Sequence, residues 1–177
     1  MAEAAELPTT AERTAHLFTF DGFLRFWAED RPQGIALDGP DRTLTYGELE
    51  QVTAQTVAGL QALGIVKGDR IAWFGKNSTL YFALFFAAAR LGVVMVPVGW
   101  RLAPAEATWI AGDAQAKAVF LGQGFEPLAD AFATLPLVGR CFTQDEAWRW
   151  IDGQQRTEFV AAGPDDAARR RRRRAAS

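Results

Sequence analysis

The chain has 177 residues, 49% of them hydrophobic and 23% charged, which is the composition of one ordinary globular domain. Its net charge of −2 hides an asymmetry: without the run Arg169–Arg174, 13 basic residues face 21 acidic ones, a charge of −8 that repels nucleic acid and anionic membranes. A single cysteine, Cys141, and a single histidine, His16, exclude an internal disulfide and a zinc site built from several thiolates or imidazoles.

The N-terminal part is expected to form an arm, a helix and a hairpin. Residues 1–20 read as a flexible arm, because acidic residues stand where an export signal would carry basic ones. His16 lies in this arm, so a catalytic triad that uses it is not expected. An amphipathic helix is predicted over 21–30, and strands over 35–38 and 43–46 flank the turn GPDR.

The clearest helix signal covers residues 48–63. Its apolar residues recur with a period of 3.6, and Gly64 follows as a stop. Thr45 and Glu48 have the spacing of a capping box, in which the hydroxyl and the carboxylate each accept the other residue's backbone N–H. This explains the segment as local structure without any chemistry.

Strands and helices then alternate. The predicted strands are 69–74, 93–98, 117–122 and 137–143, and the predicted helices are 78–91, 104–111, 126–134 and 145–152. This alternation requires crossover connections, so the predicted fold class is α/β, with a mainly parallel sheet flanked by helices.

The most hydrophobic stretch, residues 77–100, is not expected to cross a membrane. Arg90 splits it into uncharged runs of 13 and 10 residues, whereas a spanning helix needs about 20. A buried helix leading into a buried strand is the expected structure. With no transmembrane segment and one cysteine, a cytoplasmic location is expected.

Two nucleotide-binding patterns fail at their required positions. Gly75-Lys76-Asn77 resembles the end of a Walker A loop, but its first glycine would fall at Arg70. Gly122 and Gly124 follow a strand, as in a dinucleotide fingerprint, but Pro127 stands at the third glycine position. Cys141 is expected to be an inert thiol in a buried strand.

Four motifs give the chain a family resemblance. They occur in the order LTYGEL (44–49), GDRIAWFGKNS (68–78), AARLGVVMVPVGWRLAPAE (88–106) and DAQAKAVFLG (113–122). This series resembles the N-terminal region of the adenylate-forming, AMP-binding acyl-CoA synthetases, and Gly99-Trp100-Arg101-Leu102 is similar to the continuation found in their fatty-acyl branch. The resemblance implies the N-terminal subdomain of that ligase fold over residues 21–163, incomplete as a ligase domain.

Two positions depart from the family pattern. Leu80 stands where many relatives have Glu, and Ala103 stands where Thr is common before a helix. Without a side-chain acceptor at Ala103, that helix loses about 1 kcal/mol of capping. Both changes suggest a looser subdomain.

The resemblance also implies what is missing. Intact relatives use ATP, Mg²⁺ and coenzyme A, and hold the triphosphate in a Ser/Thr/Gly-rich loop that ends in Pro-Lys-Gly; this sequence has no such loop. No catalytic, cofactor-binding or metal-binding residue is therefore assigned, and the chain alone is expected to be inactive. Residues 164–177 are expected to be a disordered Arg-rich tail, produced by a shifted reading frame or a premature end of a longer ligase gene.

Two other interpretations of the tail and the chain stay open. Arg169–Arg174 could make the chain an interaction module that binds RNA or an anionic surface weakly through the tail. Alternatively, the missing C-terminal part of the ligase could be supplied in cis or by a separate chain. The sequence does not identify the acid substrate.

Overall fold

The structure is a computed structural model that describes residues 19–155. The predictions for residues 1–18 of the arm, for His16, for residues 156–163 and for the tail with Arg169–Arg174 concern residues outside this range. Thr19 and Phe20, which the sequence assigned to the end of the arm, are the N-cap and the first residue of α2.

The helices and strands follow the predicted order. Their bounds are α2 Phe20–Asp30, β1 Ile35–Asp38, β2 Thr43–Thr45, α3 Tyr46–Ala62, β3 Arg70–Phe74, α4 Thr79–Leu91, β4 Val94–Val98, α5 Pro104–Asp113, β5 Ala118–Leu121, η2 Glu126–Leu128, α6 Ala129–Ala133, β6 Arg140–Phe142 and α7 Gln144–Asp152. The α/β prediction is confirmed.

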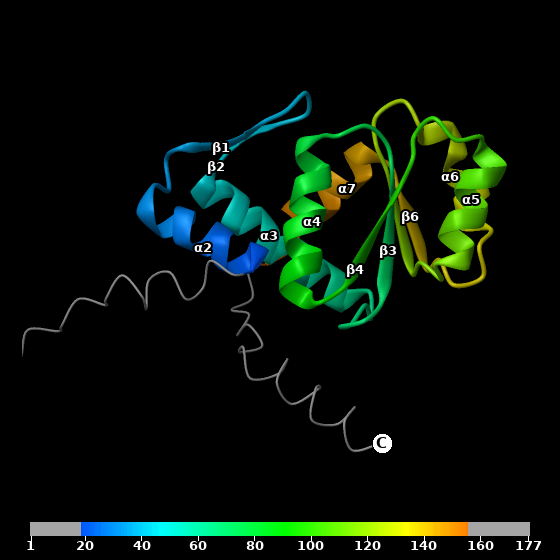
Figure 1. Cartoon of the computed structure of the whole chain (residues 1–177), viewed down its shortest axis with the longest axis horizontal. Helices are drawn as coiled ribbons and strands as arrows, with labels where there is room; N and C mark the ends of the chain where they lie inside the picture. Colours follow the sequence, from blue (N-terminus) through cyan, green and yellow to red (C-terminus); the bar gives the residue numbers. More distant parts are fainter. Residues whose placement is uncertain (1–18, 156–177) are drawn as a thin grey trace, which may run out of the picture.

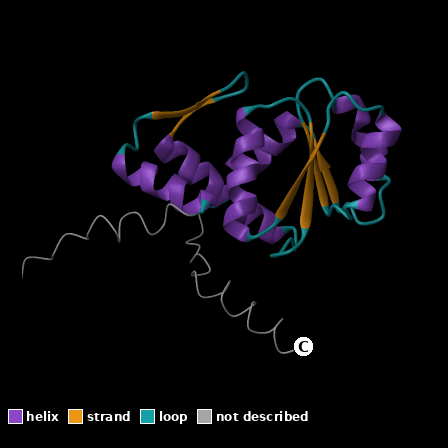
Figure 2. Cartoon of the chain, viewed as in Figure 1, coloured by secondary structure: helices purple, strands orange, loops and turns teal. Residues whose placement is uncertain are grey.

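A four-stranded parallel sheet forms the centre of the molecule. Its strand order is β4-β3-β5-β6, and Ala72 of β3 pairs with Val96 of β4 and Val119 of β5. Helices α3, α4 and α7 cover one face and α5 and α6 the other (Figure 1). The antiparallel hairpin β1-β2 forms a separate sheet. It lies away from the central sheet, on the side of the molecule where α2 lies (Figure 2).

The alternation of side chains along β3 explains why both faces need helices. Ile71 and Trp73 belong to the apolar cluster with α3, α4 and α7, whereas Ala72 and Phe74 belong to the cluster with α5 and α6. All four are at most 2% exposed. A strand buried on both faces is typical of parallel sheets with crossover helices.

The capping box at the start of α3 is confirmed. Thr45 Oγ1 accepts from the Glu48 backbone N–H (3.2 Å), and Glu48 Oε2 accepts from the Thr45 N–H (2.8 Å). This cap ends β2 at Thr45 and starts α3 at Tyr46. The predicted strand end at residue 46 and helix start at residue 48 were therefore wrong by one and two residues.

Two other elements were predicted to be longer than they are. The expected helix 126–134 begins as the 3₁₀ turn η2 before α6, and the expected strand 137–143 is reduced to β6, Arg140–Phe142. A turn bond from Val138 N–H to the Leu135 carbonyl keeps residues 137–139 out of the strand.

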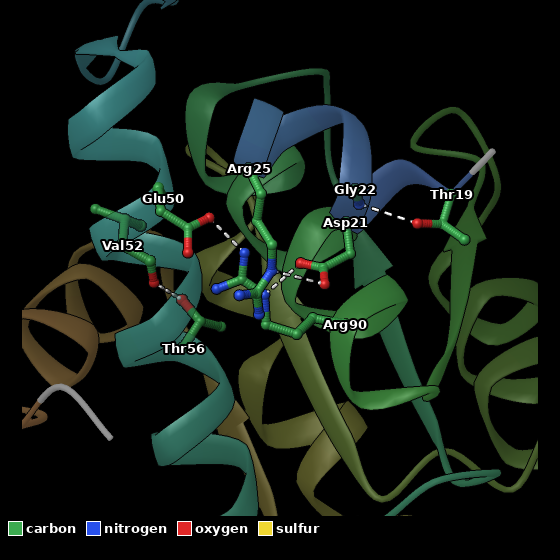
Figure 3. Close-up of polar contacts among 8 residues, drawn as sticks. All are labelled: Thr19, Asp21, Gly22, Arg25, Glu50, Val52, Thr56 and Arg90. Atoms are coloured by element: carbon green, nitrogen blue, oxygen red, sulfur yellow. Dashed lines mark hydrogen bonds and ion pairs between the residues drawn. The ribbon is translucent and has the colours of Figure 1, made fainter. Parts of the chain in front are cut away.

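A buried cation joins α2 to α3 and α4. Arg90 of α4 donates from Nε to Asp21 of α2 at 2.5 Å and from Nη2 to Glu50 of α3, while Arg25 bonds the other oxygen of Asp21 (Figure 3). Burial alone would lower the pKa of Arg90, but the hydrogen bond and charge of Glu50 and those of Asp21 outweigh it and raise that pKa. We call Arg90, Asp21, Glu50 and Arg25 the Arg90 cluster.

No helix within residues 19–155 is both long and apolar enough to span a bilayer.

Candidate functional site

Three loops meet at the carboxyl edge of the parallel sheet, where open α/β sheets usually bind their ligands. The loops follow β3, β4 and β5, and begin at Gly75, Gly99 and Gly122. Because β4 and β5 lie on opposite sides of β3, the strand order reverses between β3 and β5. Such a topological switch point is where open α/β sheets most often hold a ligand.

Backbone atoms close the switch point. A Cβ atom added at Gly75 would lie 2.8 Å from Gly122 Cα, and the Gly122 N–H donates to the Phe74 carbonyl (3.0 Å). Beneath them, the Trp73 indole N–H donates to the Gly75 carbonyl at 3.2 Å. The two glycines therefore allow the loops to touch, and this explains why a glycine follows each strand without a dinucleotide site.

The N-terminus of α4, which follows β3, already carries an anion. The Asp41 carboxylate accepts the backbone N–H groups of Thr79 (2.7 Å) and Leu80 (3.0 Å), and also the indole N–H of Trp148 (3.1 Å). A helix N-terminus attracts phosphate because its first N–H groups are unpaired. Here Asp41 satisfies two of those groups, so α4 is not a free phosphate site. Leu80, a departure from the family pattern, is fully buried at this point.

The residue after Asp41 fixes this turn to the last helix. The Arg42 guanidinium forms two hydrogen bonds with Asp152 (2.9 and 2.6 Å) and lies 4.0 Å from the centre of the Trp148 ring. The hydrogen bond with Asp152 raises the pKa of Arg42. The hairpin turn is therefore held against both α4 and α7.

The exposed charge at the carboxyl edge gathers around one indole ring. The Lys76 ammonium lies 5.0 Å from the centre of the Trp100 ring, and the Arg101 guanidinium lies 4.0 Å from it. Trp100 is half-buried, whereas both cations are exposed. We call Lys76 and Arg101 the edge cations. Among the described residues neither cation has an ion pair with a carboxylate, so both can attract an anionic ligand.

An apolar depression of about 490 Å³ adjoins the edge cations on α5. It is lined by Leu102, Ala105, Glu106, Trp109 and Ile110. The predicted absence of a side-chain cap at Ala103 is confirmed. However, the Ala103 N–H donates to Glu106 at 2.9 Å, so half of a capping box remains.

Cys141 is not a reactive thiol. Cys141 is half-buried in β6 rather than fully buried as predicted, since β6 is an end strand of the sheet. Burial, with a smaller effect of Glu146, raises its pKa to about 12, so the thiol is protonated at neutral pH. No group of three or more His, Cys, Asp or Glu residues in the part described could hold a metal ion. No step is assigned to the Mg²⁺ that the resemblance implies.

Sequence reasoning rejected Gly75-Lys76-Asn77 as a nucleotide motif but missed the edge cations and the role of Asp41. A cation or aromatic residue at the second position after each of two neighbouring parallel strands was the available signal, because such residues meet at one edge of the sheet. No residue near Asp41 in the sequence indicated its role, because its partner Trp148 is 107 residues away.

Comparison with known proteins gives a consistent match. The family described as AMP-binding enzyme matches residues 24–170. The fatty acid–[acyl-carrier-protein] ligase ScoC of Streptomyces coeruleorubidus is 35% identical over 111 residues, 63% of this chain and 21% of that protein. The long-chain-fatty-acid–CoA ligase FadD13 of Mycobacterium tuberculosis is 38% identical over 101 residues, 57% of this chain and 20% of that protein.

Solved structures agree with the sequence matches. The N-terminal domain of FACL13 from Mycobacterium tuberculosis superposes with a TM-score of 0.75 at 32% identity, covering 84% of this chain and 40% of that one. The chain thus spans about a fifth of the length of the curated relatives it matches.

Proposed function

The chain belongs to the AMP-binding enzyme family, and from this premise we propose that it forms the N-terminal α/β part of a ligase that activates a carboxylic acid as an acyl adenylate. The observation that carries the proposal is the superposition on the FACL13 N-terminal domain, which covers 84% of the chain at 32% identity. Four ordered sequence motifs support the same assignment.

The proposed reaction has two steps. A carboxylate oxygen of the acid attacks the α-phosphorus of ATP, the bond from that phosphorus to the bridging oxygen breaks, and pyrophosphate leaves. The thiol of an acceptor, either coenzyme A or an acyl carrier protein, then loses its proton as its sulfur attacks the acyl carbonyl, and AMP leaves with the electron pair of the broken carbon–oxygen bond. Both kinds of acceptor are named among the relatives. We propose a fatty acid as substrate, because these two relatives are named for fatty acids.

In this proposal the edge cations face a phosphate-bearing substrate. They lie at the carboxyl edge of the sheet, and ATP and coenzyme A both carry several phosphate charges. Lys76 and Arg101 would attract those charges, and Trp100 would fix the position of both cations. Asp41 would contribute only by holding the start of α4, two residues beyond the Lys76-Asn77 loop.

The chain by itself is proposed not to adenylate an acid. Its sequence contains no Pro-Lys-Gly phosphate loop, and charge developing on the transferred phosphorus needs fixed cationic groups around it. Purified chain should give no exchange of pyrophosphate into ATP with a panel of fatty acids. Exchange that follows the purified chain through several columns would contradict this.

A graft tests the positive half of the proposal. Residues 19–155 would replace the matching segment of the Mycobacterium tuberculosis FadD13 ligase, and the hybrid would be assayed by pyrophosphate exchange. We expect a folded hybrid that exchanges pyrophosphate in the presence of a long-chain acid. A hybrid that folds, judged by cooperative unfolding, but shows no exchange would contradict the proposal.

The alternative, an interaction module with a polyanion-binding tail, rests on Arg169–Arg174, which lie outside the described residues. It remains a prediction of the sequence. Deleting residues 169–177 and measuring RNA binding over a salt series separates the two proposals, because binding by counterion release weakens steeply with salt and would vanish with the tail.

A further inference from the structure

Strand β4 is an end strand of the sheet, and its outer edge has no partner strand among residues 19–155. The Val94 N–H donates to the Asp69 carbonyl at 2.8 Å, so the backbone groups of Val94 point toward β3. Because successive residues of a strand direct these groups to alternate sides, those of Met95 and Pro97 point outward. Proline has no N–H, so the free edge offers one donor, the Met95 N–H, beside the carbonyls of Met95 and Pro97.

An apolar groove runs along this edge. It encloses about 220 Å³ between α4 and β4, and its lining includes Tyr81, Phe85, Ala89, Val93, Met95 and Pro97. None of the residues that line it is charged. Phe20, 60% exposed, packs edge to face on Phe85 with 4.8 Å between ring centres and extends the apolar surface onto α2.

We propose that a second copy of this chain covers the groove, with the two β4 strands antiparallel across a two-fold axis at Met95. The outward N–H and carbonyl of one Met95 then meet those of the other and form two hydrogen bonds, as a self-complementary interface requires. The next position on each side brings Pro97 beside Val93, whose N–H already donates to the Ala88 carbonyl. The pairing therefore ends without a buried, unpaired N–H.

The backbone groups exposed along β4 favour a short symmetric contact over pairing with a long strand of another protein. A strand that continued the ladder past Met95 would direct a carbonyl at Pro97, which has no donor to offer. The symmetric pair needs no such bond. Since no charged side chain lines the groove, two copies can meet there without bringing like charges into contact.

The available area sets the strength of the contact. Apolar patches on single proteins are typically about 300–600 Å², whereas a standard stable interface buries about 800 Å² on each partner. The Phe20 side chain, 60% exposed, adds to the apolar surface beside the groove. We therefore expect dissociation in the micromolar range, so that dimers form at high protein concentration only.

Sedimentation of the full chain over about two decades of concentration tests this inference. The wild type and Met95→Leu, which keeps the N–H and the volume, should show a monomer–dimer equilibrium. Met95→Pro, which removes the one donor, and Ala89→Lys, which puts an exposed charge in the groove, should remain monomeric. Ala89→Lys carries the test if Met95→Pro does not fold.

Three results would overturn the inference. The wild type could stay monomeric throughout, it could form open-ended oligomers, or its dimer could persist in both Met95→Pro and Ala89→Lys. If the free chain is monomeric while the Met95 N–H is protected from hydrogen exchange in the FadD13 graft, a strand from the rest of the ligase covers the edge instead. None of these results depends on the exchange activity, so the inference and the proposed function can fail separately.

Discussion

Arg90 and Arg101 show two opposite uses of the same side chain. The Arg90 side chain is 1% exposed and is bonded to the carboxylates of Asp21 and Glu50, which come from two other helices (Figure 3). Arg101 is exposed, lies over the Trp100 ring and has no carboxylate partner among the described residues. The Arg90 cluster is therefore positioned to hold the fold, whereas the edge cations are left available to a ligand.

The largest effect is expected at the Arg90 cluster. Arg90→Ala leaves Asp21 and Glu50, whose side chains are only 12% and 15% exposed, without their shared cation. Removing one partner of such a buried pair costs about 3–5 kcal/mol. Urea unfolding of the full chain should show this loss. The control is Arg25→Ala, which removes a 38% exposed cation from the same Asp21 and should cost about 1 kcal/mol or less.

Equal destabilisation by Arg90→Ala and Arg25→Ala would contradict the role assigned to the buried Arg90 in holding the fold. The structural role of Arg90 gains support if adding Asp21→Asn and Glu50→Gln to Arg90→Ala restores part of the stability, since these two substitutions remove the cost of burying unpaired carboxylates.

The next effect concerns the scaffold beneath the edge cations. Gly75→Ala places a Cβ atom 2.8 Å from Gly122 Cα, so the β3 and β5 loops must move apart. Such overpacking costs about 1–3 kcal/mol, which thermal unfolding can measure. Gly99→Ala is the matched control, because its Cβ would lie 3.6 Å from Leu102, an ordinary contact. Equal stability of the two variants would show that the switch point is not closed as described.

A smaller effect is expected at the helix that follows Arg101. Ala103→Thr supplies the missing acceptor at the N-cap of α5, whose backbone is already extended (φ −63°, ψ 149°), and should stabilise the chain by about 1 kcal/mol. Thr143→Ala removes the corresponding acceptor of α7 and should destabilise it by a similar amount. Chemical denaturation checks both, and effects of the same sign would contradict the interpretation.

The smallest effect on stability is expected at the edge cations. Lys76→Ala and Arg101→Ala each remove an exposed charge that has no ion pair in the part of the chain described, so the free energy of unfolding should change by about 0.5 kcal/mol or less. Differential scanning calorimetry would detect a larger loss, which would assign these residues a structural role like that of Arg90.

Local signals in the sequence were sufficient for most of the fold. The spacing of Thr45 and Glu48 predicts the cap that the structure contains, and the alternation of apolar runs predicts the parallel sheet. The strand order β4-β3-β5-β6 was not predicted, because crossover connections fix handedness but not which side of β3 each strand joins.

Most of the site could not be predicted, because its contacts are not local. The contact of Lys76 with Trp100 depends on the parallel register of β3 and β4, in which Phe74 pairs with Val98. Asp41 and Arg42 reach α7 across more than 100 residues. Neither contact leaves a periodic or motif-like trace in the sequence.

The most direct test of the central claim is a kinetic one on the FadD13 graft, with Lys76→Ala and Arg101→Ala combined. KM for ATP would be measured by pyrophosphate exchange and KM for coenzyme A by thioester formation, with Arg31→Ala, which removes a cation stacked 4.5 Å from Trp27, as the matched control. We expect one of the two KM values to rise about tenfold or more, as the loss of one to two charge-assisted contacts implies, while the unfolding temperature stays within a few degrees. Unchanged KM values for both substrates would contradict the claim that the edge cations serve a ligand.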